Sequence, residues 1–152
     1  MIDLSRIEQY RESNQIEAKK ATGGLPESIW ETYSAFANTE GGVILLGVEE
    51  EPNRFLHTVD LPDPDWLIEE FWNLINDPKI ASANILRDED VQIKEVEGDH
   101  IIVINVPKAE KKDRPIYIYG DPLSGSYYRS GDGDIRFTPD AVKKMLEEAE
   151  NT

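Results

Sequence analysis

The fold is indicated most clearly by one stretch of sequence, Ser34-Ala35-Phe36-Ala37-Asn38-Thr39-Glu40-Gly41-Gly42. Its first part continues an apolar pattern at helical spacing, so we expect a helix that has Pro26 in its first turn and ends near Asn38. The two glycines end this helix and turn the chain into a strand over residues 43–48. Because that strand is apolar on both faces, it is expected to be central in a sheet.

On both sides of this stretch, alternating polarity, helical spacing and turn residues predict further elements. They are a strand over 15–19, a helix over 65–76 that starts at Asp63-Pro64, a hairpin of strands 91–96 and 100–106, short strands over 115–119 and 126–129, and a last helix over 138–150 capped by Thr138. The prediction is an α+β fold, with a mixed, mainly antiparallel sheet packed with about three helices. Trp30, Trp66 and Trp72 fall at helical spacing with apolar residues, so we expect them in the core.

The composition suits one domain over residues 1–152, because chains of this length bury about two thirds of their unfolded surface. This domain could form the N-terminal part of a longer protein. The chain carries 16 Lys and Arg against 31 Asp and Glu, a formal net charge of -15. Such a charge opposes non-specific nucleic-acid binding, which comes mainly from cations that displace counterions at phosphates. Binding to DNA or RNA would therefore need a local basic patch, a metal ion or a partner, such as a second copy in a homodimer.

The sequence also excludes several classes of site. It lacks cysteine, which rules out disulfides, zinc–thiolate sites and thiol nucleophiles. No Gly-x-x-x-x-Gly-Lys-Ser/Thr phosphate loop exists, so ATP is not an expected cofactor. The first residues lack the features of a signal peptide, and the apolar runs are too short to cross a bilayer. We therefore expect a cytoplasmic protein with no membrane partner.

Three carboxylates, those of Glu12, Glu17 and Glu50, are candidates for a functional site. A spacing of five residues brings Glu12 and Glu17 together only if the chain bends between them, and Ser13 and Asn14 favour a bend. Glu50 follows the central strand and joins them if the two strands are neighbours. Carboxylates that face one cleft either share protons or hold a hard cation, for which Mg²⁺ or Mn²⁺ would be suitable.

A bound cation could orient a phosphodiester and activate water, while Lys19 neutralises charge on the phosphate. Glu12, Glu17, Glu50 and Lys19 are thus the catalytic candidates, and the three glutamates are the candidate metal ligands. The alternative is that the run Glu49-Glu50-Glu51 is a solvated turn, since an acidic chain offers many chance groupings.

A second candidate is a nucleic-acid contact surface. Its predicted members are Lys19, Lys20, Lys111, Lys112, Arg114, Tyr128 and Arg129. Tyr128 and Arg129, if exposed beside a glycine-rich turn, could stack on bases or grip phosphate, with ordinary strand packing as the alternative. The lysines of residues 108–114 are interleaved with Glu110 and Asp113, so a solvated loop is the alternative there.

Several motifs resemble a known family. These motifs are Glu12-Ser13-x-x-x-Glu17-x-Lys19, Leu25-Pro26-x-Ser28-Ile29, residues 35–42 followed by Gly47-Val48, and later Pro115-Ile116-Tyr117 and residues 127–131. Together they are similar to the Schlafen-type AlbA_2 domain, which is also named as a DNA-binding or "divergent AAA" domain. In bacteria, such domains often form the front part of proteins described as transcriptional regulators or helicase-related proteins.

In animal Schlafen proteins, a related domain is an RNA endonuclease that uses two glutamates and an aspartate. Glu12 and Glu17 match those glutamates in position, and Glu50 stands where the aspartate is expected, which keeps the carboxylate on a longer arm. Ala18 replaces a bulky aromatic residue. The resemblance favours a nucleic-acid-binding domain of the transcriptional-regulator type. A metal-dependent ribonuclease and a protein-interaction domain without nucleic acid are the alternatives.

Overall fold

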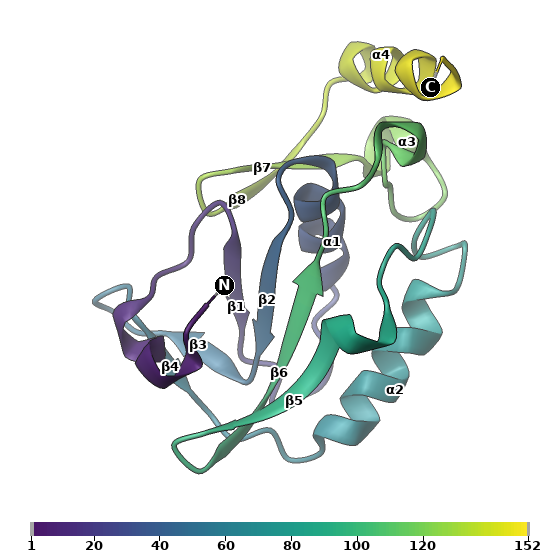
Figure 1. The fold of residues 1–152 in the computed structure, drawn as a ribbon. Helices are drawn as coiled ribbons and strands as arrows, with labels where there is room; N and C mark the ends of the chain where they lie inside the picture. Colours follow the sequence, from purple (N-terminus) through teal and green to yellow (C-terminus); the bar gives the residue numbers. More distant parts are fainter. Residues whose placement is uncertain (1, 152) are drawn as a thin grey trace.

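The chain folds around a four-stranded sheet with the strand order β1-β2-β6-β5 (Figure 1). A computed structural model describes residues 2–151. β1 (Ile16–Lys19) pairs parallel with β2 (Gly42–Leu46), and β6 (Asp99–Val106) pairs antiparallel with both β2 and β5 (Val91–Val96). The predicted α+β fold with a mainly antiparallel sheet is therefore confirmed, and so is the central position of β2.

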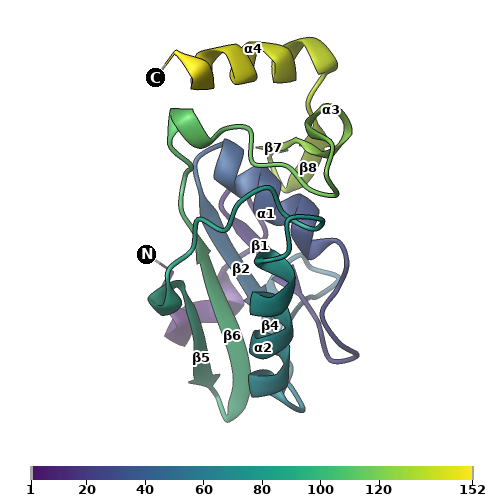
Figure 2. The ribbon, with the colours of Figure 1, turned by 90° about the vertical axis from the view of Figure 1, so that its right-hand side faces the viewer.

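Helices α1 (Ile29–Asn38) and α2 (Pro64–Ile75) cover one face of this sheet (Figure 2). Trp30 of α1 stacks on Phe71 of α2, with ring centroids 5.4 Å apart. The opposite face is covered in part by the N-terminal 3₁₀ helix η1 (Leu4–Gln9), whose Ile7 joins the apolar cluster of that face. Residues along a strand alternate between the faces, so β2 contributes to both cores.

The strand expected over residues 43–48 is interrupted at Gly47. This glycine has a φ of +83°, a conformation that a residue with a side chain rarely adopts. The chain turns there and leaves the main sheet, so that β3 (Val48–Glu50) pairs with β4 (Leu56–Thr58) in a separate two-stranded sheet. β4 has only three residues, and its short pattern did not identify it in the sequence.

The C-terminal third contains a second small sheet and three helical segments. Strands β7 (Tyr127–Ser130) and β8 (Gly133–Arg136) form a hairpin, and α3 (Pro122–Gly125) and α4 (Pro139–Glu150) flank it. Two 3₁₀ turns, η2 (Asp88–Asp90) and η3 (Lys111–Asp113), lie before β5 and after β6. Thr138 caps α4 as predicted, because its Oγ1 accepts a hydrogen bond from the Ala141 N–H at 3.2 Å.

One predicted strand is wrong. Residues 115–119 make only isolated bridges, one between Ala81 and Ile118 and one between Tyr117 and Ser126. This segment lies against two different parts of the chain, so neither contact extends into a ladder. Over residues 2–151, no helix has the length and apolar character needed to cross a membrane.

Candidate functional site

The three predicted carboxylates lie together at the β1 edge of the main sheet. Glu17 belongs to β1, and Glu50 is the last residue of β3. The turn at Gly47 brings β3 into contact with β1. A tight turn over residues 13–16 folds Glu12 back, so that its Oε2 accepts a hydrogen bond from the Ala18 N–H at 3.0 Å. The Glu12 carboxyl lies within hydrogen-bonding reach of both Glu17 and Glu50. We refer to Glu12, Glu17 and Glu50 as the carboxylate cluster.

The environment of the cluster raises the pKa of Glu12 from 4.5 to about 8. Burial is the largest cause, because it disfavours the charged form. Hydrogen bonding to Glu17 and Glu50 and the negative charge of Glu17 act in the same direction, whereas the Ala18 N–H opposes them. Burial and the neighbouring carboxylates therefore favour the protonated form of the Glu12 carboxyl.

Arg129 of β7 contacts Glu17 of the cluster, and the Arg129 side chain is fully buried. Its Nη1 lies 2.9 Å from Glu17 Oε1 and 2.7 Å from Asp134 Oδ1. Asp134 also accepts a hydrogen bond of 2.7 Å from the Thr32 hydroxyl. One buried cation thus joins the β7–β8 hairpin to α1 and β1.

The other donors of Arg129 are satisfied by the backbone. Its Nε and Nη2 donate to the Ser13 carbonyl at 3.1 and 2.9 Å, and Nη2 also donates to the Ile16 carbonyl at 3.1 Å. The guanidinium lies 4.8 Å from the centre of the Phe36 ring. The expectation that Arg129 is exposed and grips phosphate is therefore wrong, because internal partners occupy its donors.

Lys19 lies beside the carboxylate cluster, as its shared strand face with Glu17 predicted. Its Nζ is 3.6 Å from Glu17 Oε2 and 3.0 Å from Ser28 Oγ, and its side chain is only 12% exposed. Lys20 is exposed and follows the end of β1, and no ion pair or hydrogen bond joins its side chain to the cluster among the described residues. Lys19 is thus the lysine that the fold holds at the cluster.

Arg54 is a neighbour of the cluster that the sequence did not reveal. It follows β3, and its Nε lies 3.4 Å from Glu50 Oε1. Its Nη2 reaches Asp132 in the β7–β8 turn at 2.8 Å. The Arg54 side chain is 60% exposed, so these contacts are much less buried than those of Arg129. Arg54 can therefore leave Glu50 without disturbing the core.

The chemistry of this donor set fits a hard divalent cation, since every ligand atom would be a carboxylate oxygen. In the arrangement described, however, Glu17 and Glu50 already contact basic side chains. Within residues 2–151, no group of three or more His, Cys, Asp or Glu side chains is spaced as a metal site. An entering cation would have to replace the proton of Glu12 and displace Arg54 from Glu50.

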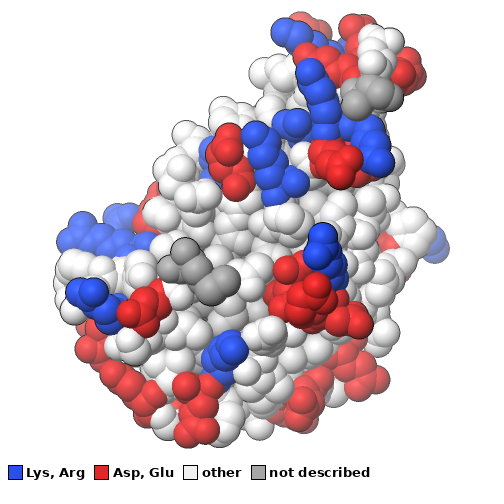
Figure 3. Space-filling view, viewed as in Figure 1, with Lys and Arg blue, Asp and Glu red and all other residues white. Residues whose placement is uncertain are grey.

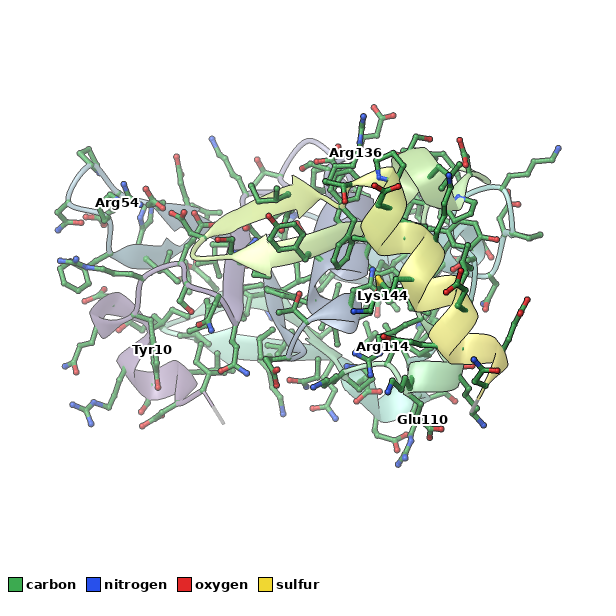
Figure 4. The ribbon with its side chains drawn as sticks, turned by 90° about the horizontal axis from the view of Figure 1, so that it is seen from above. Tyr10, Arg54, Glu110, Arg114, Arg136 and Lys144 are labelled. Carbon is green, nitrogen blue, oxygen red and sulfur yellow. The ribbon has the colours of Figure 1, made fainter. Side chains whose placement is uncertain are left out.

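A basic surface lies at the other side of the molecule. We define it by Lys108, Lys111, Lys112, Arg114, Lys143 and Lys144, which come from η3, its flanking residues and α4. α4 packs against η3, and Figure 3 shows basic side chains gathered around α4 with acidic ones among them. Figure 4 places Arg114 and Lys144 far from Arg54. The predicted nucleic-acid contacts are thus divided between two places.

The last predicted contact, Tyr128, is half-buried on β7. Its ring lies 4.9 Å from the ring of Phe137, between centroids. This is the ordinary strand packing that the sequence left open as the alternative.

Comparison with known proteins agrees with this architecture. The model of the family described as Schlafen, AlbA_2 matches residues 12–138, a range that includes the whole carboxylate cluster. The chain belongs to the Schlafen AlbA_2 family.

A solved relative of this AlbA_2 domain is the N-terminal domain of the "Putative ATP-dependent DNA Helicase RecG-related Protein" from Nitrosomonas europaea. It has 31% sequence identity and a TM-score of 0.65, over 89% of this chain and 90% of that one. The DIP2311 protein from Corynebacterium diphtheriae has 22% identity and a TM-score of 0.51, over 82% of this chain and 25% of that one, and shows the fold alone. No curated protein matches the sequence.

Proposed function

We propose that this AlbA_2 domain acts on nucleic acid and cleaves RNA at the carboxylate cluster with the help of a divalent cation. The observation that carries the proposal is the convergence of Glu12, Glu17 and Glu50 from separate segments. A buried arginine fixes Glu17, and a lysine is held beside it. Strained or costly groupings of like charge concentrate at functional sites. The name of the Nitrosomonas relative, a DNA helicase-related protein, adds support for a nucleic-acid context.

In this proposal, Glu12, Glu17 and Glu50 would hold Mg²⁺ or Mn²⁺. Such an ion, when bound, lowers the pKa of water and offsets the negative charge of phosphate. Lys19 would stabilise the charge that develops on the phosphodiester, and its hydrogen bond to Ser28 positions it for that role. Arg129 would hold Glu17 in position through their ion pair, while Arg54 would release Glu50.

The test is the cleavage of tRNA in the presence of Mn²⁺ by wild type and by Glu17→Gln. We expect the substitution to lower the cleavage rate about 100-fold or more, because it removes a charged ligand while leaving the shape of the side chain. Glu95→Gln, an exposed glutamate on β5, is the matched control and should cleave as wild type does. Intact tRNA with concentrated wild type, or equal cleavage by Glu17→Gln, would contradict the proposal.

A second candidate is nucleic-acid binding without cleavage, as expected for a domain of a transcriptional regulator. It is favoured by the basic side chains that already neutralise Glu17 and Glu50. In this case, the basic surface would make the contacts. A gel shift at low salt with single-stranded and duplex DNA or RNA tests it. Binding that is unchanged by Glu17→Gln and weakened by Lys111→Ala with Lys112→Ala supports it, whereas no shift on any of these probes eliminates it for this chain.

A further inference from the structure

Helix α2 presents an outward face that the function proposed above does not use. Residues 61–76 contain four acidic residues and no Lys or Arg. Asp63 is the N-cap of α2, Asp65 lies in its first turn, and Glu69 and Glu70 lie one turn later. Figure 2 shows α2 along the outside of the sheet. We refer to these four residues and Trp66 as the acidic aromatic face.

Trp66 is the large aromatic residue of this face, and it is 54% exposed. The prediction that it belongs to the core is therefore wrong. Trp30 is 3% exposed and stacks on Phe71, and Trp72 packs edge-on against the same ring. Trp66 lies in the first turn of α2 and has no such aromatic neighbour among the described residues. Its exposed indole is available to a ligand.

The carboxylates of the acidic aromatic face lack cationic partners within residues 2–151. Asp63 accepts a hydrogen bond from the Trp66 N–H of the backbone at 3.1 Å, as a helix cap. Glu70 has one buried carboxylate oxygen, Oε2, which lacks a hydrogen-bond partner among the described residues. Residues four apart on a helix share a face, so Glu70 lies on the side of Trp66. Asp63, Asp65 and Glu69 are exposed, so these are the carboxylates that a cationic group from outside can reach.

A small cavity adjoins Trp66. It has a volume of about 200 Å³, and its walls are Trp66, Leu67, Pro62, Asp63 and the loop of residues 21–24. Around Gly23 and Gly24, no atom lies within 4 Å of the position that a Cβ would take, so the loop wall is open. The cavity is suited to one extended side chain whose apolar stem lies against Leu67 and whose charged end stays near the carboxylates.

We propose that the acidic aromatic face binds an Arg- or Lys-bearing segment of a partner protein, with one basic side chain over the indole of Trp66 and its stem in the adjoining cavity. The face of an indole attracts cations through its ring quadrupole. Four carboxylates without cations add long-range attraction for a basic segment. The same four charges repel phosphates, so this face does not suit nucleic acid. The proposal does not depend on any reaction at the carboxylate cluster.

The test uses a synthetic peptide in which arginines alternate with glycine and serine, and isothermal titration calorimetry at low salt. We expect wild type to bind, and Trp66→Ala to weaken the affinity about tenfold, since a desolvated cation–π contact contributes of that order. Glu69→Lys with Glu70→Lys should weaken it at least as much. Trp66→Phe should retain part of the affinity, because it keeps an aromatic face. In wild type, peptide binding should also change the fluorescence of Trp66, the most exposed of the three indoles.

The matched control is Glu95→Lys with Glu97→Lys on the β5–β6 hairpin, which changes the net charge equally at another acidic place. It should leave the peptide affinity within about twofold of wild type if the contact is local. Equal affinity for Trp66→Ala and wild type overturns the proposal, as does an equal loss in the hairpin control. A loss of oligonucleotide binding in Trp66→Ala, with unchanged peptide binding, would also overturn it, because the face would then recognise bases.

Discussion

The carboxylate cluster and the basic surface differ in how firmly the fold holds their side chains. At the cluster, the Arg129 side chain is completely buried against Glu17, whose own side chain is only 13% exposed. In the basic surface, Lys112 and Lys108 are 60% and 46% exposed and make single ion pairs of 3.6 and 3.4 Å. The protein therefore fixes the position of an acidic group at the carboxylate cluster, whereas the basic surface provides positive charge without fixed geometry.

Removal of the buried cation should have the largest effect. Arg129→Met leaves Glu17 and Asp134 buried without their partner, and the Ser13 and Ile16 carbonyls lose donors. We expect the free energy of unfolding to fall by about 3–5 kcal/mol, measured by urea denaturation. Lys112→Met in the basic surface is the control and should change it by less than about 0.5 kcal/mol. Similar losses in the two variants would remove the distinction between the regions.

The packing of Gly42 against Phe36, next to Arg129, should also be sensitive to substitution. A Cβ at Gly42 would lie 2.8 Å from the buried ring of Phe36, which supports the Arg129 guanidinium. Gly42→Ala should therefore cost about 1–3 kcal/mol in thermal or urea unfolding, because the ring has to move within a packed core. Gly23→Ala is the matched control, since its Cβ would meet nothing within 4 Å. An unchanged free energy of unfolding in Gly42→Ala would show that the packing around Phe36 can accommodate the extra methyl group.

The pH dependence of the free energy of unfolding should reveal the titration of Glu12. The folded state raises the pKa of Glu12 from 4.5 to about 8, so it binds a proton in this window that the unfolded chain has released. This contribution is fully present below pH 4.5 and is lost as the pH rises through 8. Because Glu12 is only partly buried, solvent screening limits the fall in stability to about 1–2 kcal/mol.

Urea denaturation of wild type and Glu12→Gln at several pH values measures this contribution. The glutamine cannot titrate, so the free energy of unfolding of the variant should change less with pH than that of wild type between about pH 5 and 8. Parallel profiles would mean that Glu12 does not hold the proton.

The smallest effect on folding is expected in the basic surface. Lys111→Ala with Lys112→Ala should change the free energy of unfolding by less than about 0.5 kcal/mol, since both side chains are exposed. If the surface binds nucleic acid, the double variant should reduce the slope of log affinity against log salt by about 2. An unchanged slope in filter binding would show that these lysines do not contact phosphate.

Local patterns in the sequence predicted α1, α2 and α4, the strands of the main sheet and the bend that joins Glu12 to Glu17. They did not predict η1 or α3. They did not predict the turn at Gly47, because a φ above zero is only one of the conformations that glycine allows. Arg129 and Asp134 were missed as neighbours of the cluster because more than a hundred residues separate Arg129 from the Ser13 carbonyl it contacts. Trp66 was wrongly predicted to lie in the core, because helical spacing does not reveal whether the first turn of a helix packs against another element.

The contact between Arg129 and the Ser13 carbonyl also has a consequence for biosynthesis. The chain is made from its N-terminus, and the two residues are 116 positions apart. A growing polypeptide therefore carries Glu12, Glu17 and Glu50 long before Arg129, the partner of Glu17, has been translated. The buried ion pair between Glu17 and Arg129 can therefore form only after β7 has emerged from the ribosome.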